Sequence, residues 1–224
     1  MATKRTTAEL ELRTRIVDAC RQMNANGLNQ GTSGNISARW GDGILVTPTG
    51  VPYDEMTPDD IVAMTMDGSW EHGDHRPSSE WRFHLDIHRS KPEVNAIVHC
   101  HPMYSTILAI RHQEIPALHY MIACGGGNSI PCAPYATYGT PELSEHAIAA
   151  LQGRTACLLA NHGLIATGST LGKAMWLAVE VETLAKQYVY TLMLGGPKCL
   201  PDDEIDRVIE KFKDYGPRPK KQAA

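Results

Sequence analysis

Two histidines, His99 and His101, end the apolar run AIVHCH and stand two positions apart. On a β-strand, residues i and i+2 project from the same face, about 6.5–7 Å apart, so both imidazoles can reach one ion. A third imidazole, His162 in LLANHGL, ends another apolar run and is followed by Gly163, where the backbone can turn. Three protein ligands with one open position are typical of a catalytic zinc site. The alternative is that each histidine is a hydrogen-bonded structural residue.

A second set of potential ligands competes with this strand set. Glu80, His84 and His88 lie at i, i+4 and i+8 of SSEWRFHLDIHRS, which is predicted to be a helix, and such spacing can also bind a metal. Trp81 and Leu85 share that face and no HExxH order is present, which favours packing or surface histidines. Glu80, in the first helical turn, is either a cap favoured by the helix dipole or a general acid/base beside an ion.

Two turns rich in Gly, Ser and Thr could hold an anion. Exposed backbone N–H groups and short hydroxyls suit a phosphate, and they suit ordinary turns equally well. No GxxxxGK[ST] motif is present, so the phosphate interpretation depends on a metal site nearby. The residues concerned, in TSGNIS, TPTG and SSE, are Thr32, Ser33, Gly34, Asn35, Ser37, Thr49, Gly50, Ser78 and Ser79.

Helices interleaved with strands must position these groups. Hydrophobic periodicity and capping residues predict helices at 6–27, 78–90, 103–112, 140–151, 170–196 and 202–216, and strands near 44–47, 96–101 and 155–163. This alternation indicates a single layered α/β domain. The direction of the strands does not follow from periodicity.

The composition of the 224-residue chain argues against several classes of protein. A net charge of −4 is unfavourable for a nucleic-acid or anionic-membrane surface. No window approaches about 18 uninterrupted apolar residues, the length of a membrane span. The six cysteines form no CxxC and no disulfide framework, which fits free thiols in the cytoplasm. We expect one cytoplasmic domain over residues 1–216 and a flexible tail at 217–224, with no nucleic-acid or membrane partner.

The chain resembles the class II aldolase/adducin family from its first helix to its last. The stretches that carry the resemblance are, in order, GTSGNISAR, ILVTPTGVPYDEM, PSSEWRFHLDIHRSKPEVNAIVHCHP, ALHYMIACGGGNSIPCAPYATYGT, LLANHGLIA and EKFKDYG. The resemblance implies a three-layer fold in which helices flank a central, mostly antiparallel sheet. It also implies a homotetramer with its sites at subunit interfaces.

The resemblance assigns roles to particular residues. It implies Zn²⁺, with Mn²⁺ or Co²⁺ as possible substitutes, bound by His99, His101 and His162. Glu80 would lie at the metal as a ligand and as the acid/base, and Tyr120 would reach into a neighbouring subunit's site. The implied phosphate pocket is formed by Asn35, Thr49, Gly50, Ser78 and Ser79, with Thr32 close by. Tyr215 is a possible C-terminal site residue, and Asn161 stands where the resemblance predicts glutamine.

The implied reaction is reversible aldol cleavage of a ketose 1-phosphate to dihydroxyacetone phosphate and a short aldehyde. L-fuculose 1-phosphate and related deoxy- or methylthio-pentulose 1-phosphates are the candidate substrates. No lysine occurs in the site motifs, which disfavours a Schiff base. One alternative is a pentulose-phosphate 4-epimerase, whose pattern has aspartate where Glu80 stands. The other is a non-enzymatic adducin-like module, which loss of the metal histidines would mark.

Overall fold

A seven-stranded sheet forms the centre of the molecule, with strand order β3-β2-β1-β4-β7-β6-β5. The computed structural model describes residues 5–70, 73 and 75–213. Every pair of neighbouring strands is antiparallel except β5 and β6, which are parallel, so the expected mostly antiparallel sheet is confirmed. The strands are β1 (Asn35–Trp40), β2 (Gly43–Val46), β3 (Val62–Thr65), β4 (Ala96–Cys100), β5 (Cys132–Ala133), β6 (Ala156–Leu159) and β7 (Gly163–Gly168).

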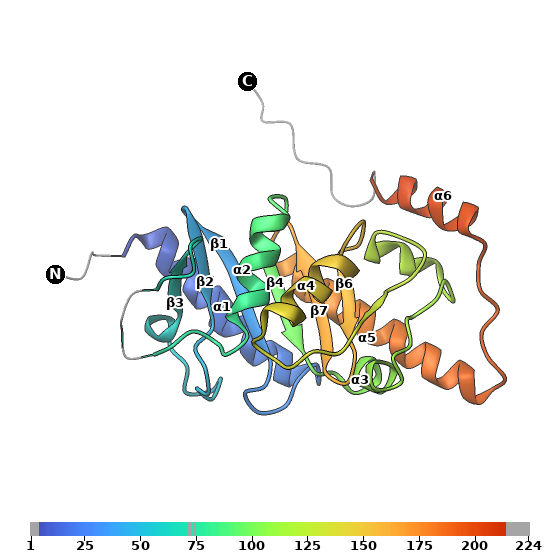
Figure 1. The fold of residues 1–224 in the computed structure, drawn as a ribbon, viewed down its shortest axis with the longest axis horizontal. Coiled ribbons are helices and arrows are strands. Elements are labelled where there is room, and N and C mark those ends of the chain that lie inside the picture. Colours follow the sequence, from blue (N-terminus) through green and yellow to red (C-terminus); the bar gives the residue numbers. More distant parts are fainter. Residues whose placement is uncertain (1–4, 71–72, 74, 214–224) are drawn as a thin grey trace, which may run out of the picture.

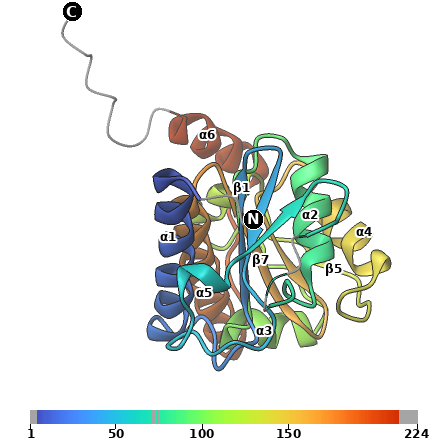
Figure 2. The same ribbon diagram turned by 90° about the vertical axis from the view of Figure 1, so that its left-hand side faces the viewer.

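Helices cover both faces of this sheet. They are α1 (Thr7–Ala25), α2 (Trp81–Ser90), α3 (Met103–Ile110), α4 (Pro141–Ala150), α5 (Leu171–Met193) and α6 (Asp202–Phe212), with short 3-10 helices η1 (Pro58–Asp60) and η2 (Tyr120–Gly125). Figure 2 shows the sheet edge-on, with α1 and α5 on one side and α2 and α4 on the other. In Figure 1, α1 and β3 lie at one end of the long axis and α6 at the other. The expected three layers are therefore present.

The alternation of side chains along β4 connects these layers to the histidines. Ala96, Val98 and Cys100 belong to the apolar core on the α1 and α5 side of the sheet. Ile97 belongs to the core formed with α2 and α4, and His99 shares its face because the side-chain period of a strand is two. His99 therefore points toward the layer that carries α2.

Three helices begin at a threonine whose side-chain oxygen accepts a backbone N–H from the first turn. Thr6 accepts from Glu9, Thr140 from Leu143, and Thr170 from Lys173. Such caps typically stabilise a protein by about 0.5–2 kcal/mol each. They explain why the capping residues in the sequence locate the starts of α1, α4 and α5 correctly.

The largest difference from the predicted elements is the strand β7. The run 155–163 was predicted as one strand, but the chain turns after Leu159 and returns as β7, which pairs with both β6 and β4. This central strand is buried along nearly its whole length. The tail predicted at 217–224 and the tyrosine Tyr215 lie outside the described residues. No helix in the described ranges is long and apolar enough to cross a membrane.

Candidate metal centre

Four side chains from three separated segments converge where β4 ends. Glu80 immediately precedes α2, His99 lies in β4, His101 follows that strand, and His162 lies in the turn between β6 and β7. One nitrogen or carboxylate oxygen from each residue lies within 4.8 Å of all the others. The structure thus brings together the three imidazoles and the carboxylate that the sequence singled out.

The imidazoles of the cluster face one another and the carboxylate. The Nε2 atoms of His99 and His101 are 2.9 Å apart. Glu80 Oε2 lies 3.2 Å from the Nε2 of His99, and Glu80 Oε1 lies 3.2 Å from the Nε2 of His162. The centroids of the three rings are separated by 4.7–5.0 Å in every pair. Their potential ligand atoms are therefore directed at a common centre.

A backbone carbonyl fixes the orientation of His99. Its Nδ1 donates to the carbonyl of Leu164 in β7 at 3.0 Å, across a register that pairs His99 with Ile165. The ring is fully buried and meets the edge of the Phe83 ring. Since the Nδ1 proton is used by the carbonyl, the Nε2 lone pair faces the cluster. Histidines that bind metals are commonly held by this kind of hydrogen bond from their second nitrogen.

The turn that carries His162 depends on an unusual backbone conformation at Asn161. Asn161 has a φ of 54°, in the left-handed region that asparagine adopts more readily than most residues with a Cβ. Its backbone N–H donates to the carbonyl of Ala109 at 3.0 Å, and its Oδ1 accepts from Nε2 of His112 at 2.5 Å. Asparagine in place of the predicted glutamine therefore suits the turn and ties it to the end of α3.

Gly163 allows the hairpin to approach His101. A Cβ at this position would lie 2.5 Å from the carbonyl oxygen of Cys100 and 2.6 Å from Cδ2 of His101. Both separations are shorter than a real Cβ tolerates. The His101 ring therefore occupies space that is free only because residue 163 has no side chain.

A carboxylate from α5 anchors the helix that follows His101. Glu182 accepts the backbone N–H groups of Tyr104 and Ser105 at 2.9 and 2.8 Å, and the Ser105 hydroxyl at 2.7 Å. The first N–H groups of a helix have no partner within the helix, and a negative charge there is also favoured by the helix dipole. Glu182 thereby fixes the segment that leaves the cluster.

The charges in the cluster are those that a divalent cation requires. Burial alone would raise the pKa of Glu80, but the imidazoles of His99 and His162 outweigh it and lower this pKa. Burial, followed by the effects of His99 and His162, lowers the pKa of His101 to about 3 against an opposing effect of Glu80. At neutral pH, Glu80 is therefore ionised and His101 neutral, and these are the forms that bind metals.

One carboxylate oxygen of the cluster makes no hydrogen bond in the described residues, which also fits a metal ligand. Glu80 Oε1 is buried and has no hydrogen-bond partner in the described part of the chain. Such a group is costly unless an ion or another partner satisfies it. Glu80 occupies the N-cap position of α2, yet its side chain makes no capping hydrogen bond. Of its two interpretations, the structure favours the one in which its carboxylate serves the cluster. Imidazole nitrogens with one carboxylate oxygen suit Zn²⁺ and related transition metals.

The competing ligand set on the helix is not assembled by the structure. His84 and His88 are buried on α2, and both face the hydroxyl of Ser37 and not the cluster. Only Glu80 of that set joins the other histidines. The interpretation of His84 and His88 as non-ligand residues therefore agrees with the structure, although neither lies at the surface.

Of the stretches proposed to hold a phosphate, TPTG lies beside the segment that immediately precedes Glu80. The backbone N–H of Ser78 donates to Thr47 at 2.8 Å, and that of Thr49 donates to Arg76 at 3.1 Å. Thr49, Gly50 and Ser79 are exposed, as is Thr32 in the preceding loop. Ser78 is buried, and its hydroxyl accepts the backbone N–H of Glu80 at 3.2 Å.

Asn35 differs from the other residues of the proposed phosphate pocket. It is buried, and its Nδ2 donates to Glu80 Oε2 at 2.9 Å. Its Oδ1 lies 2.6 Å from Nε2 of His84. Both ends of the amide are therefore engaged inside the protein, a function that the sequence did not reveal.

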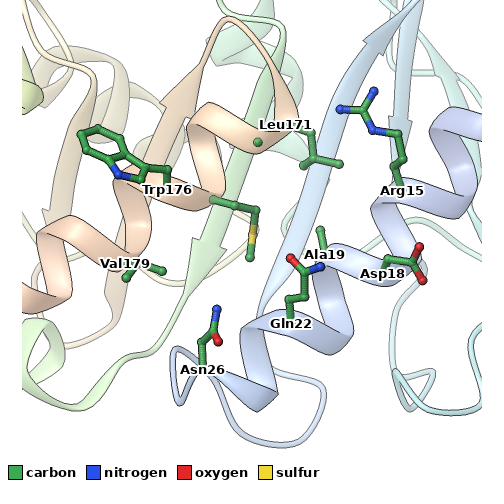
Figure 3. Close-up of a pocket in the computed structure, with 10 residues that line it drawn as sticks. Arg15, Asp18, Ala19, Gln22, Asn26, Leu171, Trp176 and Val179 are labelled. Atoms are coloured by element: carbon green, nitrogen blue, oxygen red, sulfur yellow. The ribbon is translucent and has the colours of Figure 1, made fainter. Parts of the chain in front are cut away.

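Tyr120 is not a member of the cluster. It begins η2 and is 49% exposed. With Met121 and Phe212 it lines a cavity of about 1170 Å³, and none of the four cluster residues belongs to that lining. A smaller groove of about 460 Å³ between α1 and α5, lined by residues such as Gln22 and Trp176, contains neither Tyr120 nor any other predicted site residue (Figure 3).

Comparison with known proteins agrees with this geometry. The profile of the Class II Aldolase and Adducin N-terminal domain matches residues 14–189. The 5-methylthioribulose-1-phosphate/5-deoxyribulose-1-phosphate aldolase of Rhodospirillum rubrum is 54% identical over 209 residues, which cover 93% of this chain and 94% of that protein. The L-fuculose phosphate aldolase of Escherichia coli K12 is 54% identical over 209 residues, covering 93% and 97%. A solved L-fuculose 1-phosphate aldolase superposes with a TM-score of 0.89 at 36% identity, covering 95% and 100%.

Proposed function

Because the chain belongs to the class II aldolase and adducin family, we propose that it is a metal-dependent aldolase acting on a ketose 1-phosphate. The products would be dihydroxyacetone phosphate and a short aldehyde, and the reaction would be reversible. The observation that carries this proposal is the convergence of Glu80 with His99, His101 and His162. Relatives of equal identity are named for L-fuculose phosphate and for methylthio- and deoxyribulose 1-phosphates, which supports the substrate class but leaves the aldehyde open.

The metal proposed for this centre is Zn²⁺, held by the three imidazoles with Glu80 beside them. A divalent ion supplies a Lewis acid that polarises the substrate ketone and stabilises the negative charge released when the carbon–carbon bond breaks, a contribution of several kcal/mol. Mn²⁺ and Co²⁺ accept similar ligands and are possible substitutes.

Glu80 is proposed as the general acid/base. Its ionised carboxylate can take up a proton and return it to the carbon of the enediolate, completing dihydroxyacetone phosphate. Burial among imidazoles keeps the carboxyl in place and away from bulk water. The turns with Thr49, Gly50 and Ser79 offer exposed N–H and hydroxyl groups beside it, which suit the substrate phosphate and would fix its orientation.

Tyr120 is proposed to act at the site of a neighbouring subunit. Its phenolate form could take the proton from the hydroxyl that becomes the aldehyde and release that proton to solvent before the next turnover. Its exposure, in a cavity whose lining contains no cluster residue, supports this assignment, and the proposed homotetramer would supply the neighbouring subunit. A cytoplasmic location is proposed because none of the six cysteines forms a disulfide.

In the test, purified protein of measured metal content is incubated separately with each member of a panel of ketose 1-phosphates. The panel contains L-fuculose 1-phosphate, 5-deoxyribulose 1-phosphate and 5-methylthioribulose 1-phosphate, and both products are quantified. We expect equimolar dihydroxyacetone phosphate and aldehyde from at least one substrate, and loss of both after chelation. A pentulose 5-phosphate is offered separately, and its conversion to the 4-epimer, without cleavage of any ketose 1-phosphate, would establish the epimerase alternative. No conversion of any substrate would leave only the interaction module.

A further inference from the structure

A chain of buried polar groups leads from Glu80 away from the metal cluster. Asn35 Nδ2 lies 2.9 Å from Glu80 Oε2, and Asn35 Oδ1 lies 2.6 Å from Nε2 of His84. The hydroxyl of Ser37 is 2.8 Å from Nδ1 of His84 and 3.0 Å from Nε2 of His88. The four residues beyond Glu80 are at most 4% exposed, so water does not complete their hydrogen bonds.

The carboxylate fixes the direction of the first bonds in this chain. An ionised carboxylate only accepts, so Asn35 must present its N–H group to Glu80. The carbonyl oxygen of Asn35 then faces His84, whose Nε2 must carry a proton to donate. Burial lowers the pKa of His84 well below its usual value, so the ring is neutral and its Nδ1 is an acceptor. The hydroxyl of Ser37 has one proton and lies nearer to this nitrogen, at 2.8 Å, than to Nε2 of His88, at 3.0 Å, so we assign its donation to His84.

At the end of this series of hydrogen bonds that is farthest from Glu80, His88 faces two acceptors but has a single N–H group. The oxygen of Ser37 now offers lone pairs to Nε2 of His88, while Nδ1 of His88 lies 3.1 Å from the carbonyl of Val94. A neutral imidazole has one N–H and can donate to only one of these two oxygens. The incomplete hydrogen bond therefore falls at His88, the member of the chain farthest from Glu80. The end nearest the cluster is fully satisfied.

We propose that His84 is a positioning residue for Glu80. In its Nε2–H tautomer, His84 keeps the amide of Asn35 turned so that its N–H meets Glu80 Oε2. Without that donor the amide could rotate and place its carbonyl oxygen against the carboxylate, where the two would repel. Glu80 Oε2 is thereby held by Asn35, which fixes the orientation of the carboxylate, with Oε1 3.2 Å from Nε2 of His162, for the proposed proton transfer. This last step rests on the proposed function, but the tautomer does not.

The tautomer can be measured directly in protein labelled with ¹⁵N-histidine. Long-range ¹H–¹⁵N correlation distinguishes the two neutral tautomers and the imidazolium, and His84→Gln identifies the signal that belongs to His84. We expect a neutral Nε2–H ring at pH 7.5, both with Zn²⁺ and after its removal. In Ser37→Ala, which removes the hydroxyl bonded to Nδ1, the ring should stay Nε2–H through Asn35, but its Nδ1 signal should move. An Nδ1–H ring or an imidazolium in the unaltered protein, or an unchanged signal in Ser37→Ala, would overturn the proposal.

Two substitutions of His84 separate positioning from packing. His84→Leu removes the donor, and we expect kcat to fall about 10–100-fold with little change in KM, the usual scale for a group that orients a residue at a metal site. His84→Gln retains an N–H of similar reach and should restore most of kcat. The control is His146→Leu on α4, which should keep normal kcat because the ring of His146 is hydrogen-bonded to the carbonyl of Pro134 and is not part of the network around Glu80.

The outcomes of these substitutions are separable from failure of the proposed function. Equal kcat in His84→Leu and His84→Gln, or a loss confined to KM, would reject positioning. If His84→Leu does not fold, Ser37→Ala supplies the same comparison, with an expected smaller fall in kcat. A protein that cleaves no ketose 1-phosphate at all would refute the proposed function, while the NMR measurement would still decide the tautomer of His84.

Discussion

Two groups of histidines surround Glu80, one in direct contact with it and one connected to it through Asn35. They differ in the partners of their ring nitrogens. The strand group, His99, His101 and His162, directs its Nε2 atoms at one another and at the carboxylate. In the helix group, His84 and His88, every nitrogen faces an amide, hydroxyl or carbonyl oxygen. Burial does not distinguish them, because His99 and His84 are both fully buried. The partners of the nitrogens decide which group can hold an ion.

The two groups also differ in how they can be reached. His101 and His162 are half-buried, so a substrate can approach the strand group from outside. The helix group is buried between α2 and β1, and it is connected to the strand group by hydrogen bonds through Asn35 to Glu80 and by the ring of Phe83. An imidazole pair on the helix therefore supports the site, whereas the strand group forms it.

The largest difference is expected between two single substitutions, one that removes an imidazole of the strand group and one that removes an imidazole of the helix group. His101→Ala should lose both bound zinc and cleavage activity, because two imidazoles and one carboxylate hold the ion far less tightly. His88→Gln should retain its zinc. Metal content after dialysis, measured by mass spectrometry, checks both expectations. Zinc retained in His101→Ala, or lost in a folded His88→Gln, would remove the distinction between the groups.

Glu80 contacts the strand group directly and the helix group through Asn35, and its substitution should have the next largest effect. We expect Glu80→Gln to lower kcat by about 10²–10⁴, the usual scale for a positioned acid/base. Zinc measured in the same samples separates loss of the ion from loss of proton transfer. Glu145→Gln, an exposed glutamate on α4, is the matched control and should be unaffected. Near-normal turnover in Glu80→Gln would remove the assignment.

Acid should destabilise the metal-free protein through its buried imidazoles. Burial and Arg39 lower the pKa of His88 from 6.5 to about 4. As the pH falls below 6.5, the unfolded chain binds a proton that folded His88 refuses until about pH 4, so the free energy of unfolding decreases. One such group should cost on the order of 2–3 kcal/mol at pH 4.5. Urea unfolding at pH 7 and 4.5 measures this, and His88→Gln should lose less stability than the unaltered protein. Equal losses would contradict it.

The smallest effect concerns the turn that carries His162. Asn161→Gln places a longer side chain in the left-handed region and should destabilise the protein by about 1 kcal/mol. Asn161→Gly keeps the backbone conformation but loses the bond to His112, so it separates the two contributions. Thermal unfolding provides the measurement. A glutamine variant as stable as the unaltered protein would show that the turn imposes no restriction at this position.

The sequence predicted those parts of the site that depend on local spacing. The two-residue interval between His99 and His101 put them on one face of the predicted strand, although β4 itself ends at Cys100. The serines of SSE located Glu80 at the start of α2. Contacts between distant strands were not predictable in this way. Asn35 reaches Glu80 because β1 pairs with β4 in a register that places Asn35 opposite His99. No local sequence pattern indicates that pairing register.

Two further features escaped prediction for different physical reasons. The strand β7 is buried on both faces, so it lacks the alternation of polar and apolar residues that marks a half-exposed strand. The role of Asn161 depends on a backbone angle that only the folded turn reveals. The role of Tyr120, which the resemblance implies, stays a prediction because its proposed partner belongs to another subunit.

The close approach of Gly163 to His101 couples variation at positions 101 and 163. A side chain introduced at 163 would meet both the carbonyl oxygen of Cys100 and the imidazole at 101, and loss of the imidazole removes only the second of these clashes. Effects at these two positions should therefore not add, and random libraries that vary one of them alone would sample mostly damaged hairpins. Redesign of this centre for a different coordination geometry should begin by changing the pair together.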